Sequence, residues 1–158
     1  MQEDFQVVFN KALKIVSISP QFEKPLFLKL KRYGYDEDII KEVILKLKEL
    51  NYINDYEYAK SYAKMLFEKK GYSESFVFNR LIQKGVDKDI VSDVIKSLNR
   101  DINKDEILLK FIKKNRSKFK KYLENNKERD IINTFYRYGF QLENFDEVLS
   151  LTKKIVEE

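Results

Sequence analysis

Charged side chains that could bind an anionic partner are concentrated in one short segment, residues 110–121, which read KFIKKNRSKFKK. The segment has no acidic residue, and its basic residues are Lys110, Lys113, Lys114, Arg116, Lys118, Lys120 and Lys121. Lysine and arginine neutralise nucleic-acid phosphates and also attract acidic protein surfaces. A solvated helix face usually mixes both signs of charge, so the run indicates a binding surface. Lysine is abundant in this chain, however, and an ordinary solvated face is the alternative.

A second, smaller group of basic residues lies in the middle of the chain. Its members are Lys69, Lys70, Arg80 and Lys84. Arginine is scarce in this sequence, and Arg32 and Arg137 each stand two residues before a glycine of a repeated segment. Together with the run at 110–121, these residues make up the basic surface predicted to bind a partner or DNA.

Acidic residues and tyrosines could also do chemistry, but each has a simpler structural explanation. The acids Asp36, Glu37 and Asp38 could hold a metal ion or exchange protons, yet they suit the start of a capped helix better. Tyrosines could stack nucleobases. The candidates for such stacking are Tyr33, Tyr35, Tyr52, Tyr56, Tyr58, Tyr62 and Tyr72. Most fall on helix faces that packing requires, so a role in the core is favoured.

The composition excludes several classes of enzyme. The chain contains no histidine and no cysteine, which rules out Ser–His and Cys–His catalysis and a disulfide framework. No catalytic residue, metal or cofactor is predicted. It has no run of about 18 apolar residues and no basic start typical of a signal peptide, so a cytoplasmic protein is expected. The net charge of +5 and the pI near 9.1 permit contact with nucleic acid.

An internal repeat indicates the elements that must position these side chains. Residues 29–47 read KLKRYGYDEDIIKEVILKL and residues 80–98 read RLIQKGVDKDIVSDVIKSL, so Gly34 corresponds to Gly85. Each glycine is expected to end one helix in a left-handed conformation, and the aspartate two residues later to cap the next helix. A divergent third copy, NTFYRYGFQLENFDEVL, contains Gly139 but has glutamine in place of the capping aspartate.

Helical periodicity predicts an all-α fold, an elongated array of three tandem three-helix repeats. Only 2 prolines and 4 glycines interrupt the chain, and no strand pattern competes. The predicted repeats span residues 1–52, 53–100 and, in divergent form, 101–158. Within the third repeat, one continuous helix is expected over about 103–122. Stacked repeats share apolar surfaces, which allows terminal repeats to diverge.

The ordered set of motifs resembles the RecX family, the regulatory proteins that bind the RecA recombinase. The resemblance starts at ALKIV, continues through LKLKRYGYDEDIIKEVILKLKELNYINDYEYAKSYA and KKGYSESFVFNRLIQKGVDKDIVSDVI, and ends in FYRYGF. Its most specific parts are LNYINDYEYA and the KGV of the second repeat. The chain departs from the family in having Asn54 before Asp55, where two aspartates are common. It also has SISPQFEKP where the family has a basic, serine-containing approach to the first repeat helix.

The resemblance implies a non-enzymatic modulator that binds RecA nucleoprotein filaments, in their groove or at their end, and contacts DNA there. It would inhibit RecA recombinase and ATPase activity in DNA repair, recombination and the SOS response. No cofactor and no membrane contact are implied, and a monomer is expected. One alternative is a RecA-independent DNA-binding protein with helix-turn-helix-like modules, although the helix after each glycine begins with acids that phosphates would repel. A scaffold without any nucleic-acid role is the other.

Overall fold

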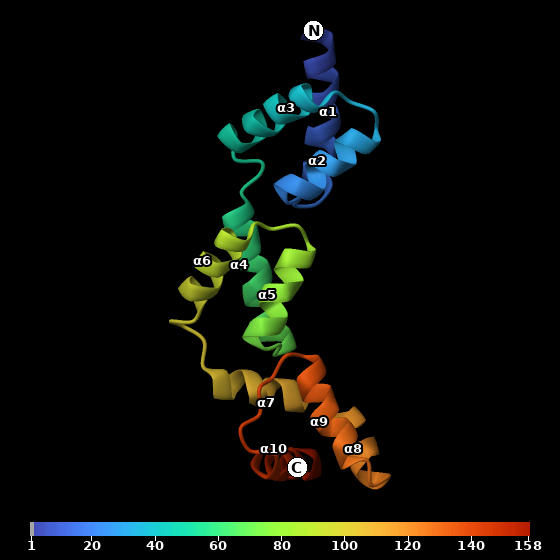
Figure 1. Cartoon of the computed structure of the whole chain (residues 1–158), viewed down its shortest axis with the longest axis vertical. Helices are drawn as coiled ribbons and strands as arrows, with labels where there is room; N and C mark the ends of the chain where they lie inside the picture. The colour runs from blue at the N-terminus through green and yellow to red at the C-terminus, as the bar shows by residue number, and fades with distance from the viewer. Residues whose placement is uncertain (1) are drawn as a thin grey trace. The chain divides into compact units, whose positions relative to one another are not determined.

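The computed structural model describes the backbone of residues 2–158 and the side chains from Phe5 onward (Figure 1). Helices joined by turns make up this part of the chain, and no β-strand occurs in it. The elements are α1 (Gln2–Ile18), α2 (Glu23–Arg32), α3 (Glu37–Glu49), α4 (Asp55–Met65), the π-helical turn η1 (Leu66–Lys70), α5 (Glu74–Gln83), α6 (Lys88–Leu98), α7 (Lys104–Lys114), α8 (Arg116–Glu124), α9 (Glu128–Arg137) and α10 (Phe145–Glu157). The all-α prediction is confirmed.

The helices divide into two compact units. Unit 1 comprises the chain up to Ser61 together with Leu81–Val94, and unit 2 comprises Tyr62–Arg80 together with Ile95–Glu158. The divisions fall inside α4, α5 and α6, so each of these helices contributes residues to both units. The units therefore do not coincide with the predicted repeats, and the division at residues 52 and 100 stays a prediction.

The core of unit 1 forms because its helices each bury one apolar face. In α3 the apolar residues recur at the three-to-four spacing of an amphipathic helix, and those buried are Ile40, Val43, Ile44 and Leu47. The cluster around them also contains Val8, Ala12, Ile15, Leu26, Leu30 and Ile53. Burial of each large apolar side chain contributes about 1.5–3 kcal/mol. Tertiary packing, more than intrinsic helix propensity, therefore holds these helices.

The predicted turns at the first two repeat glycines are present. Gly34 has a φ of +87° and Gly85 a φ of +85°, both in the left-handed region that glycine adopts without strain. Asp36 Oδ1 accepts hydrogen bonds from the backbone N–H groups of the second and third residues of α3, at 2.9 and 3.3 Å. Asp87 Oδ1 accepts one from the second residue of α6 at 2.8 Å. These aspartates are helix caps, as the sequence predicts.

The third repeat turn keeps its glycine and moves its cap. Gly139 has a φ of +77°, but α10 starts only at Phe145, because Asn144 caps it by accepting a hydrogen bond from the backbone N–H of Glu147 at 3.2 Å. Asparagine caps a helix about as well as aspartate does. The third copy has glutamine where the first two have the capping aspartate, so the repeat does not predict a cap at Asn144.

The prediction of one helix over residues 103–122 is wrong, because the chain breaks at Asn115. The backbone N–H of Asn115 donates to the carbonyl oxygens of Phe111 and Ile112, both at 3.1 Å, and its side-chain amide donates to Phe111 O at 2.9 Å. In an unbroken helix, Phe111 and Phe119 would point about 80° apart. The break lets both rings be fully buried in one core. Four helices, α7–α10, thus occupy the segment where the sequence predicts three.

Aromatic rings dominate the core of unit 2. The ring centres of Phe111 and Phe135 lie 5.2 Å apart, and those of Phe119 and Phe135 lie 5.5 Å apart. Offset and edge contacts of this kind add to the free energy gained by burial alone. The same core includes Ile131 of α9 and Ile155 of α10. It therefore fixes the end of α9 and the turn at Gly139 that follows it.

Candidate functional site

The basic run at 110–121 is divided between α7 and α8, which Figure 1 shows as two separate helices. Its basic side chains are exposed, apart from Lys118, which is half-buried. None of them forms an ion pair with a carboxylate in the part of the chain whose side chains are described. The run therefore presents positive charge that the fold itself does not neutralise.

Three members of the run have a contact within unit 2. The ammonium group of Lys114 donates to the backbone carbonyl of Lys69. The guanidinium of Arg116 donates to a carbonyl of α10 at 3.4 Å, and Lys118 Nζ lies 5.7 Å from the centre of a tyrosine ring. The remaining members make no such contact with the described residues, and these are Lys110, Lys113, Lys120 and Lys121. They are the members of the run best placed to meet a partner.

A groove of about 490 Å³ in unit 2 brings together three predicted basic residues that are distant in sequence. Lys70, Arg80 and Arg137 line it, all three exposed, and no carboxylate does so. Its other lining residues are Tyr62, Met65, Leu66, Tyr72, Phe76 and Tyr138. We call it the aromatic–basic groove. The sequence predicts its three cations individually but not their convergence, because Arg80 and Arg137 lie on helices far apart along the chain.

Three half-buried rings pack against one another in this groove. The ring centre of Tyr72 lies 4.6 Å from that of Phe76 and 5.2 Å from that of Tyr138, with which it stacks. Burial raises the pKa of the Tyr72 hydroxyl, the neighbouring Tyr138 adds to this, and the positive charge of Arg80 partly offsets it. The Tyr72 hydroxyl is therefore neutral at physiological pH, and the charge of the groove is that of its cations.

Two serines at the start of α5 form hydrogen bonds with the turn that follows α9. These bonds join the N-terminal segment that lines the groove to its C-terminal segment. Ser73 Oγ donates to the carbonyl of Tyr138 at 2.5 Å, and Ser75 Oγ donates to the carbonyl of Gly139 at 2.9 Å. Ser73 Oγ also accepts from the backbone N–H of Phe76 at 3.3 Å, so Ser73 caps α5. Nothing in the sequence marks the bonds to Tyr138 and Gly139, because they join segments about 65 residues apart.

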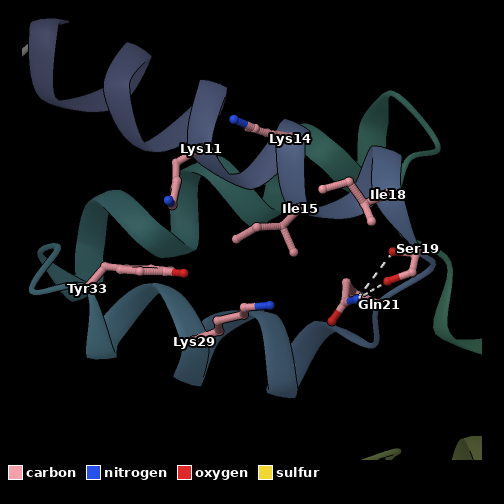
Figure 2. A pocket seen from close by; sticks show the side chains of 8 residues that line it. All are labelled: Lys11, Lys14, Ile15, Ile18, Ser19, Gln21, Lys29 and Tyr33. Carbon is pink, nitrogen blue, oxygen red and sulfur yellow. Dashed lines mark hydrogen bonds between the residues drawn. The ribbon is translucent and has the colours of Figure 1, made fainter.

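A smaller notch of about 230 Å³ lies in unit 1 (Figure 2). Lys11 and Lys14 reach it from α1 and Lys29 from α2, and no carboxylate lines it. Lys11 Nζ lies 4.4 Å from the centre of the Tyr33 ring, and Gln21 Nε2 donates to a serine hydroxyl at 2.9 Å. These lysines are absent from the predicted basic surface, although the spacing of Lys11 and Lys14 places them on one face of a helix.

A third hollow, of about 810 Å³, lies in unit 1 beside α2, α3 and the turn at Gly85. Its lining mixes apolar residues with both signs of charge. Asp55 Oδ1 accepts from the backbone N–H of Glu23 at 2.9 Å, and the Glu23 carboxylate pairs with Lys48 Nζ at 2.8 Å. Burial raises the pKa of Asp55, while the hydrogen bond to Glu23 raises the pKa of Lys48. These groups have a structural role, because Asp55 accepts the otherwise unpaired backbone N–H at the start of α2.

The remaining predicted residues do not join a common site. Arg32 and Lys84 belong to unit 1, and neither lines the notch or the hollow there. Lys69 belongs to unit 2 and is exposed on η1 next to Lys70, but only Lys70 lines the groove. The acids Asp36–Asp38 cap and begin α3, and no group of three potential metal ligands occurs among the described residues. No helix within residues 2–158 is long and apolar enough to cross a membrane.

Two protein-family models match this chain. Residues 9–47 match "RecX, first three-helix domain", and residues 54–95 match "RecX, second three-helix domain". "Regulatory protein RecX" of Caldanaerobacter subterraneus subsp. tengcongensis is 31% identical over 149 residues, which cover 90% of this chain and 69% of that protein. "Regulatory protein RecX" of Finegoldia magna is 32% identical over 108 residues, which cover 66% of this chain but only 53% of that protein.

A solved structure has the same fold. The crystal structure of RecX from Lactobacillus salivarius superposes with a TM-score of 0.77, covering 98% of this chain and 99% of that chain at 24% identity. The fold and the two family models thus define an all-helical protein with tandem three-helix domains. This chain belongs to the RecX family, whose curated members are named regulatory proteins. The predicted resemblance is confirmed.

Proposed function

We propose that this protein binds nucleoprotein filaments of RecA and inhibits their recombinase and ATPase activity, and so restrains DNA repair by recombination and the SOS response. Membership of the RecX family carries the proposal. The unneutralised cations of unit 2 support it, since a filament that contains DNA offers phosphates and acidic protein surfaces. The protein would act in the cytoplasm as a monomer, in the groove or at the end of the filament, without a cofactor or catalytic step.

The proposal is tested by DNA-stimulated ATP hydrolysis of the cognate RecA. This protein is added to preformed filaments at amounts far below one per RecA, and its binding to bare DNA is titrated separately at the same salt. Strong inhibition together with weak binding to bare DNA supports the proposal. Tight binding to bare DNA without inhibition would favour a RecA-independent DNA-binding protein. The acidic first turns of α3 and α6 argue against that second function, because phosphates would repel them.

The four lysines of the run that make no contact within the fold provide the first mutational prediction. Changing all four to glutamate is expected to raise the concentration needed for half-inhibition about tenfold or more, because opposite charges replace attraction by repulsion. The variant is Lys110→Glu, Lys113→Glu, Lys120→Glu and Lys121→Glu. Changing the same positions to glutamine should cause a smaller loss. The measurement is the RecA ATPase titration, with circular dichroism to verify the helical fold.

A matched control separates position from total charge. It carries the same four-fold reversal at exposed lysines of unit 2 outside the run: Lys96→Glu, Lys104→Glu, Lys127→Glu and Lys154→Glu. We expect this control to inhibit more strongly than the variant of the run. Equal inhibition by both folded variants would remove the run from the binding surface.

A further inference from the structure

We propose that the aromatic–basic groove of unit 2 binds single-stranded nucleic acid, with bases against its rings and phosphates beside its cations. Tyr72, Phe76 and Tyr138 supply the rings, while Lys70 and Arg137, together with Arg80, supply the positive charge. Proteins bind single strands with this combination, since every base has a face that stacks and every nucleotide carries a phosphate. A fully paired duplex hides its base faces and would not use the rings.

The distribution of burial and charge in the groove fits this ligand. The three aromatic residues are half-buried and line the groove, so each keeps part of its surface accessible there. The three cations are exposed at the rim, and none pairs with a carboxylate among residues 5–158. Two of them are arginines, which can contact phosphate with two parallel hydrogen bonds and can also stack on bases.

The groove is held in shape without a ligand. The bonds from Ser73 to the Tyr138 carbonyl and from Ser75 to the Gly139 carbonyl join its two sides. Tyr72, which precedes α5, and Tyr138, which follows α9, stack with their ring planes 14° apart. A site that is ordered in advance loses less conformational entropy when it binds. The feature is therefore a preformed surface rather than loose side chains that happen to be near one another.

An acidic peptide is the competing occupant, and the rings argue against it. Carboxylates would satisfy the cations, but an acidic chain has no flat groups to place on three clustered aromatic residues. The notch formed by Lys11, Lys14 and Lys29 lacks such a cluster and could meet any anion. The presence of rings and cations together is what singles out the aromatic–basic groove.

This inference rests on the proposed function in one respect, since a protein that binds RecA filaments has a DNA strand within reach. Its test does not depend on RecA. The full chain is titrated into a fluorescently labelled short oligothymidylate, and binding is followed by anisotropy at several salt concentrations. The variant Arg80→Gln/Arg137→Gln is compared with the control Arg100→Gln/Arg129→Gln, which removes the same charge at exposed arginines outside the groove.

The groove variant is expected to bind the oligothymidylate about tenfold more weakly than the control at low salt. Each lost phosphate contact should also reduce the slope of log K against log salt by about 0.7. Equal affinity and equal slope for the two variants would overturn the proposal. Circular dichroism and a urea melt verify that both variants are folded.

A second comparison tests the rings. Phe76→Leu keeps an apolar side chain of similar size but removes a stacking face. It should weaken binding of the oligothymidylate about fivefold or more, yet leave binding of an abasic oligonucleotide of equal length and charge unchanged. If wild type binds the abasic strand or a poly-glutamate peptide as tightly as the oligothymidylate, the groove is a site for anions or acidic protein, and the proposal fails.

The two proposals fail in different ways. Inhibition of RecA by a protein whose groove variants bind single strands normally would refute this inference alone. Groove-dependent binding of single strands by a protein that leaves the RecA ATPase unaffected would refute the proposed function alone.

Discussion

Gly139 and Gly34 share a left-handed backbone but differ in what surrounds them. A Cβ at Gly139 would lie 2.3 Å from Ser75 Oγ and 2.6 Å from Ser73 Oγ, whereas nothing lies within 4 Å of a Cβ at Gly34. The sequence predicts the backbone conformation, because the glycine recurs at the same place in each repeat. It does not predict the crowding, because the two serines come from a segment more than 60 residues earlier.

Gly139→Ala should therefore destabilise the protein more than Gly34→Ala does. The strained backbone alone is expected to cost about 1 kcal/mol at each position. At Gly139 the serine hydroxyls must also move, which would break their bonds to the turn. Urea unfolding followed by circular dichroism measures both variants. Equal losses of unfolding free energy would contradict the crowding at Gly139.

Asp55 is a residue whose ionisation opposes folding. Its half-buried carboxylate accepts a bond from the N–H of Glu23, but burial is the largest effect and raises its pKa in the folded state. The folded protein thus binds the proton more tightly than the unfolded chain does. Stability from this group is highest at acid pH and falls as pH rises from the unfolded pKa through the raised folded pKa.

The variant Asp55→Asn tests this sign. Its amide oxygen can still accept from Glu23, but it carries no charge to desolvate. The unfolding free energy of the wild type relative to Asp55→Asn should decrease as pH rises through that window and then level off above the folded-state pKa. Urea melts across the acidic pH range measure the difference. A difference that grows with pH would mean that the folded-state pKa is lowered.

At the scale of the elements, the turns were easier to predict than the length of the helices. Glycine and aspartate act locally, so Gly34 with Asp36 and Gly85 with Asp87 predict a helix end and the next cap from a few residues. The break at Asn115 has no such signal, since the KKNRSK sequence contains neither glycine nor proline. Burial of two phenylalanines in a shared core decides it, which is a tertiary effect.

The caps offer a direct test at this scale. Asp36→Ala should lower the free energy of unfolding by about 1 kcal/mol, because two N–H groups at the start of α3 lose their acceptor. Asp36→Ser should recover most of that loss, since a serine hydroxyl can also accept. Thermal or urea melts of the three proteins measure the effect. An alanine variant as stable as the serine variant would show that the cap contributes nothing.

At the scale of the whole molecule, the sequence predicts the family and the sign of the surface charge better than the site. Each predicted cation is exposed or half-buried, as solvation of charge requires. Which cations meet is a property of the fold. Lys70, Arg80 and Arg137 converge, whereas Arg32 and Lys84 belong to unit 1. Periodicity places a residue on a face of its own helix, but only the packing of helices decides which faces form a groove.

The composition of the aromatic–basic groove has a consequence during synthesis on the ribosome. The core of unit 1 is built mainly from residues between Val8 and Ile53, so it can form early, as N-terminal domains generally do. The aromatic–basic groove needs Arg137 and Tyr138, which are translated long after the residues of that core. A nascent chain therefore lacks this surface until the end of α9 has been translated, and a protein truncated before α9 would be released without it.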